Sequence, residues 1–184
     1  MDGAIAVSFL VAGVRTVRHG DVAAWIVGGV QVAVALAFVW RTAERRAGGW
    51  AEVAAALPSL VLAGVVFAGG VEWSGPATVL AALGAGITLG GMASLGRSFA
   101  VLPGVRELRT GGLYRFVRHP IYLGEAIILA AAASCVGPWA VVLAALAVVL
   151  LAWRIQAEER LLGSEPGWSA FAARVRFRLV PGVW

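Results

Sequence analysis

The sequence predicts an all-α, polytopic integral membrane protein with five or six transmembrane helices, a C-terminal helical hairpin and a cytosolic cap. Of its 184 residues, 60% are hydrophobic and only 14% are charged, whereas roughly a quarter of an average soluble domain is charged. The mean hydropathy is +0.86. The apolar residues are gathered into long runs and the arginines cluster between particular runs, a pattern typical of helices that cross a bilayer.

Six apolar runs, interrupted by charged residues or by Gly and Pro, follow one another along the chain. They cover residues 4–14, 22–40, 53–71, 77–95, 120–136 and 138–155. A spanning helix needs about 20 residues, because about 1.5 Å of rise per residue must cover about 30 Å of hydrocarbon. The first run is short, so the number of spans is five or six. Because this run is followed by Arg15 and not by a small-residue cleavage site, we expect a retained segment and not a signal peptide.

The placement of the arginines predicts the orientation in the membrane. All fifteen basic residues are arginine, and if all six runs cross the bilayer, only Arg15 and Arg18 fall on one side. An excess of positive charge marks the cytoplasmic side, and the arginine-only, alanine-rich composition suits a GC-rich bacterial genome. We therefore expect a protein of the bacterial inner membrane whose active site faces the cytoplasm. Its basic patches favour anionic headgroups, and no nucleic-acid-binding motif accompanies them.

The chain is expected to divide into N-terminal transmembrane helices, residues 1–95, and a functional core, residues 96–184. Only Gly137 and Pro138 link the fifth and sixth runs, which requires a tight antiparallel helical hairpin. The polar stretch 96–119 and the polar tail after Ile155 fall on the same side of the membrane. We expect these two stretches to meet and to form a cap over the mouth of the hairpin.

The tail carries a helical pattern of its own. Trp168, Phe171 and Val175 are spaced at i, i+3 and i+7, and Arg174 and Arg178 are one turn apart. This pattern predicts a helix that lies at the membrane interface. A lipid-surface anchor and a direct contribution to the site both fit it.

Polar side chains open the fifth run. Arg118, Tyr122 and Glu125 lie at i, i+4 and i+7, and His119 is three residues before Tyr122, so a helix here would carry one polar face. Ionisable groups at membrane depth are costly unless they are paired, which makes them functional candidates. For Glu125, a structural pairing with an arginine is the favoured interpretation. The second histidine, His19, falls on the opposite predicted side, so no metal site is expected.

A second polar cluster closes the sixth run. It consists of Arg154, Glu158, Glu159 and Arg160. Arg154 and Glu158 are four residues apart and would face the same way, although such a pair is usually a solvated surface ion pair. Here the predicted hairpin brings the cluster level with His119, so both clusters are expected to face one site.

Small residues inside the apolar runs have structural interpretations. The glycines within 84–91 have no strand before them, so they predict close helix packing and not a phosphate-binding loop. Cys135 is the single cysteine, which excludes an internal disulfide framework.

Four motifs stand in the C-terminal half of the chain. They are Leu95-Gly96-Arg97-Ser98-Phe99, Gly112-Leu113-Tyr114 followed by Arg118-His119-Pro120-Ile121-Tyr122, Glu158-Glu159 followed by leucines, and Leu179-Val180-Pro181-Gly182. With these motifs, residues 95–184 resemble the isoprenylcysteine carboxyl methyltransferases and their prokaryotic relatives, integral membrane enzymes that use S-adenosylmethionine. The resemblance implies that the functional core is a methyltransferase core. The sequence departs from the family at Trp168 and Phe171, where tyrosine is common, and in the shorter stretch between Glu159 and Trp168.

The resemblance implies a cofactor site and an acceptor site. The implied contacts to S-adenosylmethionine, with S-adenosylhomocysteine as the product, are Arg106, Glu107, Leu108, Arg109, Tyr114, His119, Pro120, Ile121, Tyr122 and Glu158. Arg154 stands at the position that the family associates with the acceptor. Arg154, Arg118 and Glu159 are the candidate catalytic residues. The residue types agree with this cofactor, whose carboxylate, ammonium, ribose and adenine need basic, acidic and aromatic partners.

The expected reaction is carboxyl O-methylation of an isoprenylcysteine-like or other lipophilic acceptor. An ionised carboxylate needs no general base, and the enzyme mainly aligns the two reactants. An amine acceptor, as in phospholipid N-methyltransferases, must lose a proton, which makes His119 or Glu159 a candidate base. A thiol acceptor, as in membrane S-methyltransferases, needs a base to form the thiolate.

Two other classes of function fit parts of the sequence. A sterol-type membrane reductase that uses NADPH has a comparable C-terminal helical arrangement, and a small transporter or structural protein would also be this apolar. The run 140–151 contains no ionisable residue, which counts against a transport pathway. The expected partners are a lipophilic or prenylated acceptor and membrane lipids, with no nucleic acid. The acceptor's identity and the oligomeric state stay open.

Overall fold

The computed structural model describes residues 2–18, 20–40, 46–68, 71–99, 104–105 and 108–184. Its α-helices are α1 Asp2–Val17, α2 Val22–Trp40, α3 Trp50–Ala68, α4 Gly75–Leu95, α5 Pro120–Ala133, α6 Ala140–Leu162 and α7 Trp168–Arg174. Three short 3-10 helices are η1 Gly96–Ser98, η2 Gly112–Arg115 and η3 Gly137–Trp139. The two-residue strands β1 Arg46–Ala47 and β2 Gly104–Val105 pair antiparallel.

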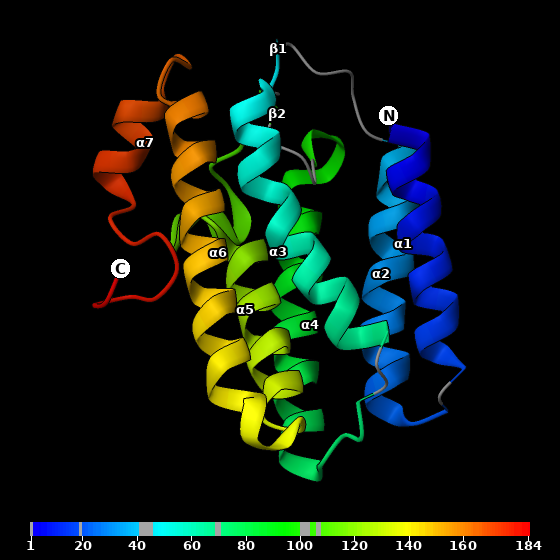
Figure 1. Ribbon diagram of the computed structural model, residues 1–184. Coiled ribbons are helices and arrows are strands. Elements are labelled where there is room, and N and C mark those ends of the chain that lie inside the picture. Colours follow the sequence, from blue (N-terminus) through cyan, green and yellow to red (C-terminus); the bar gives the residue numbers. More distant parts are fainter. Residues whose placement is uncertain (1, 19, 41–45, 69–70, 100–103, 106–107) are drawn as a thin grey trace.

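The predicted all-α class is confirmed, because each of the six apolar runs forms a helix (Figure 1). In the described part of the chain, four helical stretches are long and apolar enough to cross a membrane, namely Val22–Trp40, Trp50–Phe67, Gly75–Ser98 and Gly137–Leu162. The first and fifth runs give the shorter apolar helices Ile5–Val17 and Pro120–Ala133. The protein is therefore an integral membrane protein in which α5 is too short to cross about 30 Å of hydrocarbon by itself.

The predicted hairpin of α5 and α6 is present, but its link is longer than expected. Helix α5 ends at Ala133, because the Ser134 hydroxyl and the Cys135 amide turn back to carbonyls of the last turn. Gly137 has a φ of +66°, a left-handed conformation that glycine adopts readily. Helix α6 continues to Leu162, beyond the expected end at Ile155. Both glutamates of the second cluster are consequently helical.

The polar segments collect at one end of the bundle. In Figure 1, the two strands and α7 lie at the end opposite the turn between α5 and α6. Arg15 lies in the last turn of α1 and Arg18 directly follows this helix, at the opposite end of the bundle, whereas the described arginines of the cap lie with α7. Among the described residues, these arginines are thus separated along the long axis of the bundle, as the prediction of orientation requires. Arg41, Arg45 and Arg106 lie outside those residues.

Close contact between α4 and α5 holds the functional end of the bundle in place. A Cβ atom at Gly84 would lie 2.7 Å from the Gly124 carbonyl oxygen, and one at Gly91 would lie 2.7 Å from the Ile121 side chain. These glycines let the two backbones approach each other, as small residues do between membrane helices. The prediction of packing glycines is confirmed at both positions, whereas Gly86 has nothing within 4 Å.

Replacing Gly84 by Ala is expected to lower the free energy of unfolding by about 1–3 kcal/mol, because the added methyl group must push α5 away. Gly86→Ala is the matched control in the same helix, where open space and better helix propensity should leave stability unchanged or slightly raised. Unfolding of both variants in detergent micelles measures the difference. Equal stability of the two variants would contradict the close α4–α5 contact.

Candidate functional site

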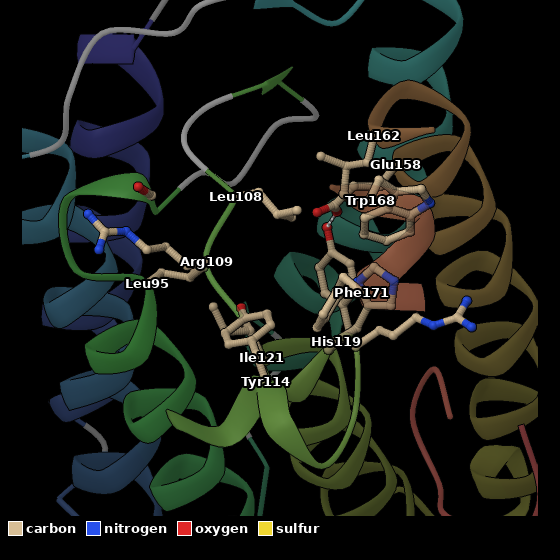
Figure 2. Close-up of a pocket in the computed structure, with 13 residues that line it drawn as sticks. Leu95, Leu108, Arg109, Tyr114, His119, Ile121, Glu158, Leu162, Trp168 and Phe171 are labelled. Atoms are coloured by element: carbon tan, nitrogen blue, oxygen red, sulfur yellow. Dashed lines mark hydrogen bonds between the residues drawn. The ribbon is translucent and has the colours of Figure 1, made fainter. Parts of the chain in front are cut away.

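A polar cavity opens where the cap meets the start of α5 and the end of α6 (Figure 2). Its volume is about 90 Å³. It is lined by Leu95, Ser98, Leu108, Arg109, Tyr114, Arg118, His119, Ile121, Tyr122, Glu158, Leu162, Trp168 and Phe171. We call it the polar cavity. Basic, acidic and aromatic side chains therefore share one small space. The two predicted clusters meet there only in part, because Glu125, Arg154, Glu159 and Arg160 do not line it.

A chain of polar contacts runs from the polar cavity into the membrane. The Tyr122 hydroxyl donates a hydrogen bond to the Glu158 carboxylate, which Figure 2 shows as a dashed line. The Arg154 guanidinium lies 4.6 Å from the centre of the Tyr122 ring. Its Nη1 is 3.4 Å from Glu125 Oε2 and donates to Ser59 Oγ at 3.4 Å. The predicted pairing of Glu125 with an arginine is confirmed. Arg154 on α6 balances the negative charge of Glu125 on α5.

Glu159 is the centre of a second set of contacts. Its Oε1 lies 3.0 Å from Arg118 Nη1 and 3.2 Å from His119 Nε2, and its Oε2 accepts from Arg178 Nε at 2.8 Å. The His119 ring in turn stacks on Tyr122 with centroids 5.5 Å apart. Glu159 therefore orients His119 at the cavity wall, and both of its oxygens are engaged by cations or a ring nitrogen.

Arg118 lies outside the polar face on which the sequence predicted it. Helix α5 begins only at Pro120, so the i, i+4, i+7 spacing from Arg118 does not apply. Its guanidinium instead binds the chain after α6, because Nε donates to Val175 O at 2.7 Å and Nη2 to Ala172 O at 2.9 Å. The Arg118 amide also donates to Phe177 O at 2.9 Å. These contacts join α7 and the tail to the start of α5.

Arg118→Met is expected to weaken the docking of α7 by about 1.5–3 kcal/mol, the value of a hydrogen bond to a charged group. Hydrogen exchange of the amides of Phe171 and Val175 should then become faster. Arg118→Lys keeps a charge beside Glu159 but loses the forked guanidinium, so its effect should be intermediate. Arg176→Met removes an exposed arginine and serves as the control. Unchanged exchange in Arg118→Met would refute the anchoring role.

Helix α7 packs its apolar face inward, which favours the second of its two predicted roles, a direct contribution to the site. Trp168, Phe171 and Val175 are buried with Tyr114 in one cluster. The helix ends at Arg174, so Arg178 is not on its face and binds Glu159 from the irregular tail. The predicted helix is present, and Trp168 and Phe171 of its apolar face line the polar cavity.

Tyr114 closes the polar cavity from the cap. Burial, and to a smaller extent the negative charge of Glu158, raises the pKa of Tyr114 well above its ordinary value. The phenol therefore stays protonated at any physiological pH and presents a hydrogen-bond donor as well as an aromatic face. Together with the cluster around α7, it confirms that the two polar stretches meet in a cap.

A second, larger cavity lies within the membrane-spanning part. It measures about 420 Å³ and is almost entirely apolar. It is lined by Ile5, Ser8, Phe9, Ala12, Val27, Val30, Gln31, Val34, Leu57, Leu60, Val61, Ala63, Gly64, Phe67, Thr88, Phe99, Ile121, Tyr122, Glu125, Ile128, Leu129 and Arg154. We call it the apolar cavity. Ile121 and Tyr122 line both cavities, and no other described residue does.

The predicted cofactor contacts fall into three groups. Seven line the polar cavity, namely Leu108, Arg109, Tyr114, His119, Ile121, Tyr122 and Glu158. Pro120 does not line it, because this residue is fully buried and its ring lies beside Gly91 of α4. Arg106 and Glu107 lie outside the described residues. Arg109 is exposed and, in Figure 2, its guanidinium points away from Glu158.

Sequence reasoning missed several residues that line the apolar cavity or contact its wall. Ser59 of α3 contacts Arg154, and Phe99 and Gln31 line the apolar cavity. Ser59 and Gln31 are polar residues inside apolar runs, and that signal was available in the sequence. Phe99 carried no such signal, because its contribution depends on how the cap folds back over α4.

The structure combines an apolar helical bundle with two cavities that adjoin at the start of α5. Residues 75–164, just under half of the chain, match the family model described as PEMT: Phospholipid methyltransferase. This segment is therefore similar to the phospholipid methyltransferase family. No curated protein matches the chain in sequence.

The match has a limited extent. It includes α4, which lies on the N-terminal side of the boundary expected at residue 95, and it stops before α7. The narrower resemblance to isoprenylcysteine carboxyl methyltransferases is not part of the match and stays a prediction.

Proposed function

We propose that this protein transfers a methyl group from S-adenosylmethionine to the polar head of a lipid-like acceptor. The single observation that carries the proposal is the shared wall of the two cavities. A hydrophilic cofactor in the polar cavity and a lipophilic acceptor in the apolar cavity would approach each other across Ile121 and Tyr122. Holding two reactants in line is the main task of an enzyme in methyl transfer.

The residues of the polar cavity fit S-adenosylmethionine by their chemistry. Glu158 offers a carboxylate to the cofactor's ammonium or ribose hydroxyls, and Tyr114 and Trp168 offer aromatic surface to adenine. When bound, the cofactor supplies an electrophilic methyl group on a sulfonium. His119, held by Glu159 and stacked on Tyr122, fixes the wall beside it.

We infer that the polar cavity widens when the cofactor binds. At about 90 Å³, it is smaller than the roughly 300–1,000 Å³ of ordinary small-molecule sites. Helix α7 forms its outer wall and is attached mainly through Arg118 and the Phe171 cluster. We infer that α7 shifts outward when the cofactor enters, while the hydrogen bonds of Arg118 hold its C-terminal end.

The polar end of the apolar cavity favours an amine acceptor. Arg154 is 3% exposed and Glu125 is 21% exposed, so the carboxylate is the more accessible member of the pair. The arginine's charge is already balanced, which weakens its attraction for a second carboxylate. An ammonium headgroup can bind Glu125, lose its proton to that carboxylate and attack the methyl carbon, while the sulfur keeps the electrons of the broken bond.

Carboxyl O-methylation is the alternative that the motif resemblance implies. The ionised acceptor would then displace Glu125 from Arg154, and no proton would need to leave. The acceptor is an ammonium in one reaction and an ionised carboxylate in the other. The polar end of the apolar cavity must therefore favour one of these two acceptors.

The test is incubation of the purified protein with labelled S-adenosylmethionine and a total lipid extract, followed by identification of the labelled product. A methylated aminolipid would support amine transfer, and a base-labile methyl ester would support the alternative. Intact folded protein that fails to bind S-adenosylhomocysteine in calorimetry would refute the proposed function. Stabilisation by NADPH alone in a thermal-shift screen would favour the reductase class instead.

A further inference from the structure

One polar side chain faces the apolar cavity from the N-terminal helices. Gln31 lies midway along α2, among Val27, Val30 and Val34 of the same cavity wall. It belongs to neither predicted cluster and to no step of the proposed reaction. Its helix lies outside the segment that matches the phospholipid methyltransferase family.

In the described part of the chain, the protein contacts the oxygen of the Gln31 side-chain amide but not its nitrogen. The Thr16 hydroxyl on α1 lies 3.2 Å from Gln31 Oε1 and 2.9 Å from the Ala12 carbonyl oxygen. This contact engages the amide oxygen of a side chain that lines the apolar cavity. Within the described residues, the Gln31 amide nitrogen has no hydrogen-bond acceptor.

An amide donor in an apolar space is costly unless a partner satisfies it. The penalty for an unpaired buried amide is of the order of one hydrogen bond or more. Water could satisfy it while the cavity is empty, but a lipid that fills the cavity displaces that water. The occupant must then either supply an acceptor or leave the donor unpaired.

We propose that Gln31 is a specificity contact that donates a hydrogen bond to a carbonyl oxygen of an acylated lipid. The inference rests on the proposed function, because it concerns the occupant of the same apolar cavity. An ester carbonyl is a neutral, strong acceptor and matches a neutral donor among apolar side chains. A prenyl or alkyl chain has no such group and would leave the amide unsatisfied.

The rigid attachment of α1 to α2 supports this role. Cβ atoms at Gly13 and Gly28 would each lie 2.8 Å from the other glycine's carbonyl oxygen, so the two backbones are in direct contact. Together with the Thr16 contact, this packing fixes the position of Gln31 relative to the cavity. A fixed donor discriminates between ligands better than a mobile one.

The experiment compares diacyl and dialkyl-ether phosphatidylethanolamine of equal chain length, offered together to the purified protein and counted as bound complexes by native mass spectrometry. The wild-type protein should prefer the diacyl lipid by about 3- to 10-fold, the value of one net hydrogen bond. Gln31→Met should reduce the ratio to about one, because methionine keeps the length and loses the donor.

Thr16→Val is the matched control, since it removes the contact from Thr16 to Gln31 but keeps the amide donor and the backbone contact of Gly13 with Gly28. It should lower the diacyl preference only in part, because the donor remains and is less firmly oriented. Equal binding of both lipids by the wild-type protein, or an undiminished preference in Gln31→Met, would overturn the inference. Equal binding by the wild-type protein overturns it even if a variant does not fold.

Calorimetry with S-adenosylhomocysteine on the same preparation separates this inference from the proposed function. Binding of the cofactor product without a diacyl preference removes only the role of Gln31. Failure to bind the cofactor product removes the proposed function itself.

Discussion

Glu158→Gln is expected to lower the affinity for S-adenosylhomocysteine by about 10- to 100-fold, the value of a hydrogen bond to a charged group. The substitution keeps the shape of the side chain and an oxygen that can accept from the Tyr122 hydroxyl. It removes the one carboxylate of the described wall of the polar cavity. Isothermal calorimetry of the purified protein in detergent measures the change.

The control for this variant is Glu72→Gln. Glu72 is exposed and precedes α4 at the opposite end of the bundle, so its loss should leave the affinity unchanged. His119→Ala should weaken binding as well, because it removes a side chain that lines the polar cavity and also contacts Glu159. An unchanged affinity in Glu158→Gln would remove Glu158 from the cofactor site.

Arg154→Met is expected to lower the free energy of unfolding by about 3–5 kcal/mol, because it leaves the Glu125 carboxylate without its partner inside the bundle. The Arg154 side chain is 3% exposed and contacts Glu125, Ser59 and the Tyr122 ring. Titration into a denaturing detergent measures the loss. Arg160→Met, which removes an exposed arginine of the same helix, should have little effect.

The double variant Glu125→Met/Arg154→Met separates stability from function. Replacing both members of a buried ion pair by apolar residues is often neutral or stabilising, so stability should return close to that of the wild-type protein. Methyl transfer to the lipid acceptor should stay abolished, while binding of S-adenosylhomocysteine persists. Full methyl transfer by the double variant would show that the pair is structural only.

Periodicity and charge in the sequence predict those features of the fold that depend on hydrophobic length and on the placement of charges. The six helices, the hairpin and the meeting of the two polar clusters follow from apolar runs and from arginine placement. The resemblance added residues that the structure gathers on the wall of the polar cavity, such as Tyr114 and Glu158. Pro120 is the exception, because a proline that begins a helix also packs against the neighbouring helix.

The partners of the charged residues could not be predicted in the same way. Arg154 and Glu158 are neighbours on one helix face, yet Arg154 pairs with Glu125 and Glu158 accepts from Tyr122. Arg118 was expected beside Glu125 and instead holds the tail. Side-chain partners depend on distances across several helices, and helical spacing gives only neighbours on one helix.

The amino-acid sequence by itself determined the membrane-spanning architecture and the end of the bundle at which polar chemistry gathers, because hydrophobic length and charge act locally along the chain. Only the tertiary structure decided that α7 turns inward, that Glu159 engages Arg118, His119 and Arg178, and that a large apolar cavity adjoins a small polar one. These features arise where segments far apart in the sequence pack together, and the shape of the space between them is not encoded in any single segment.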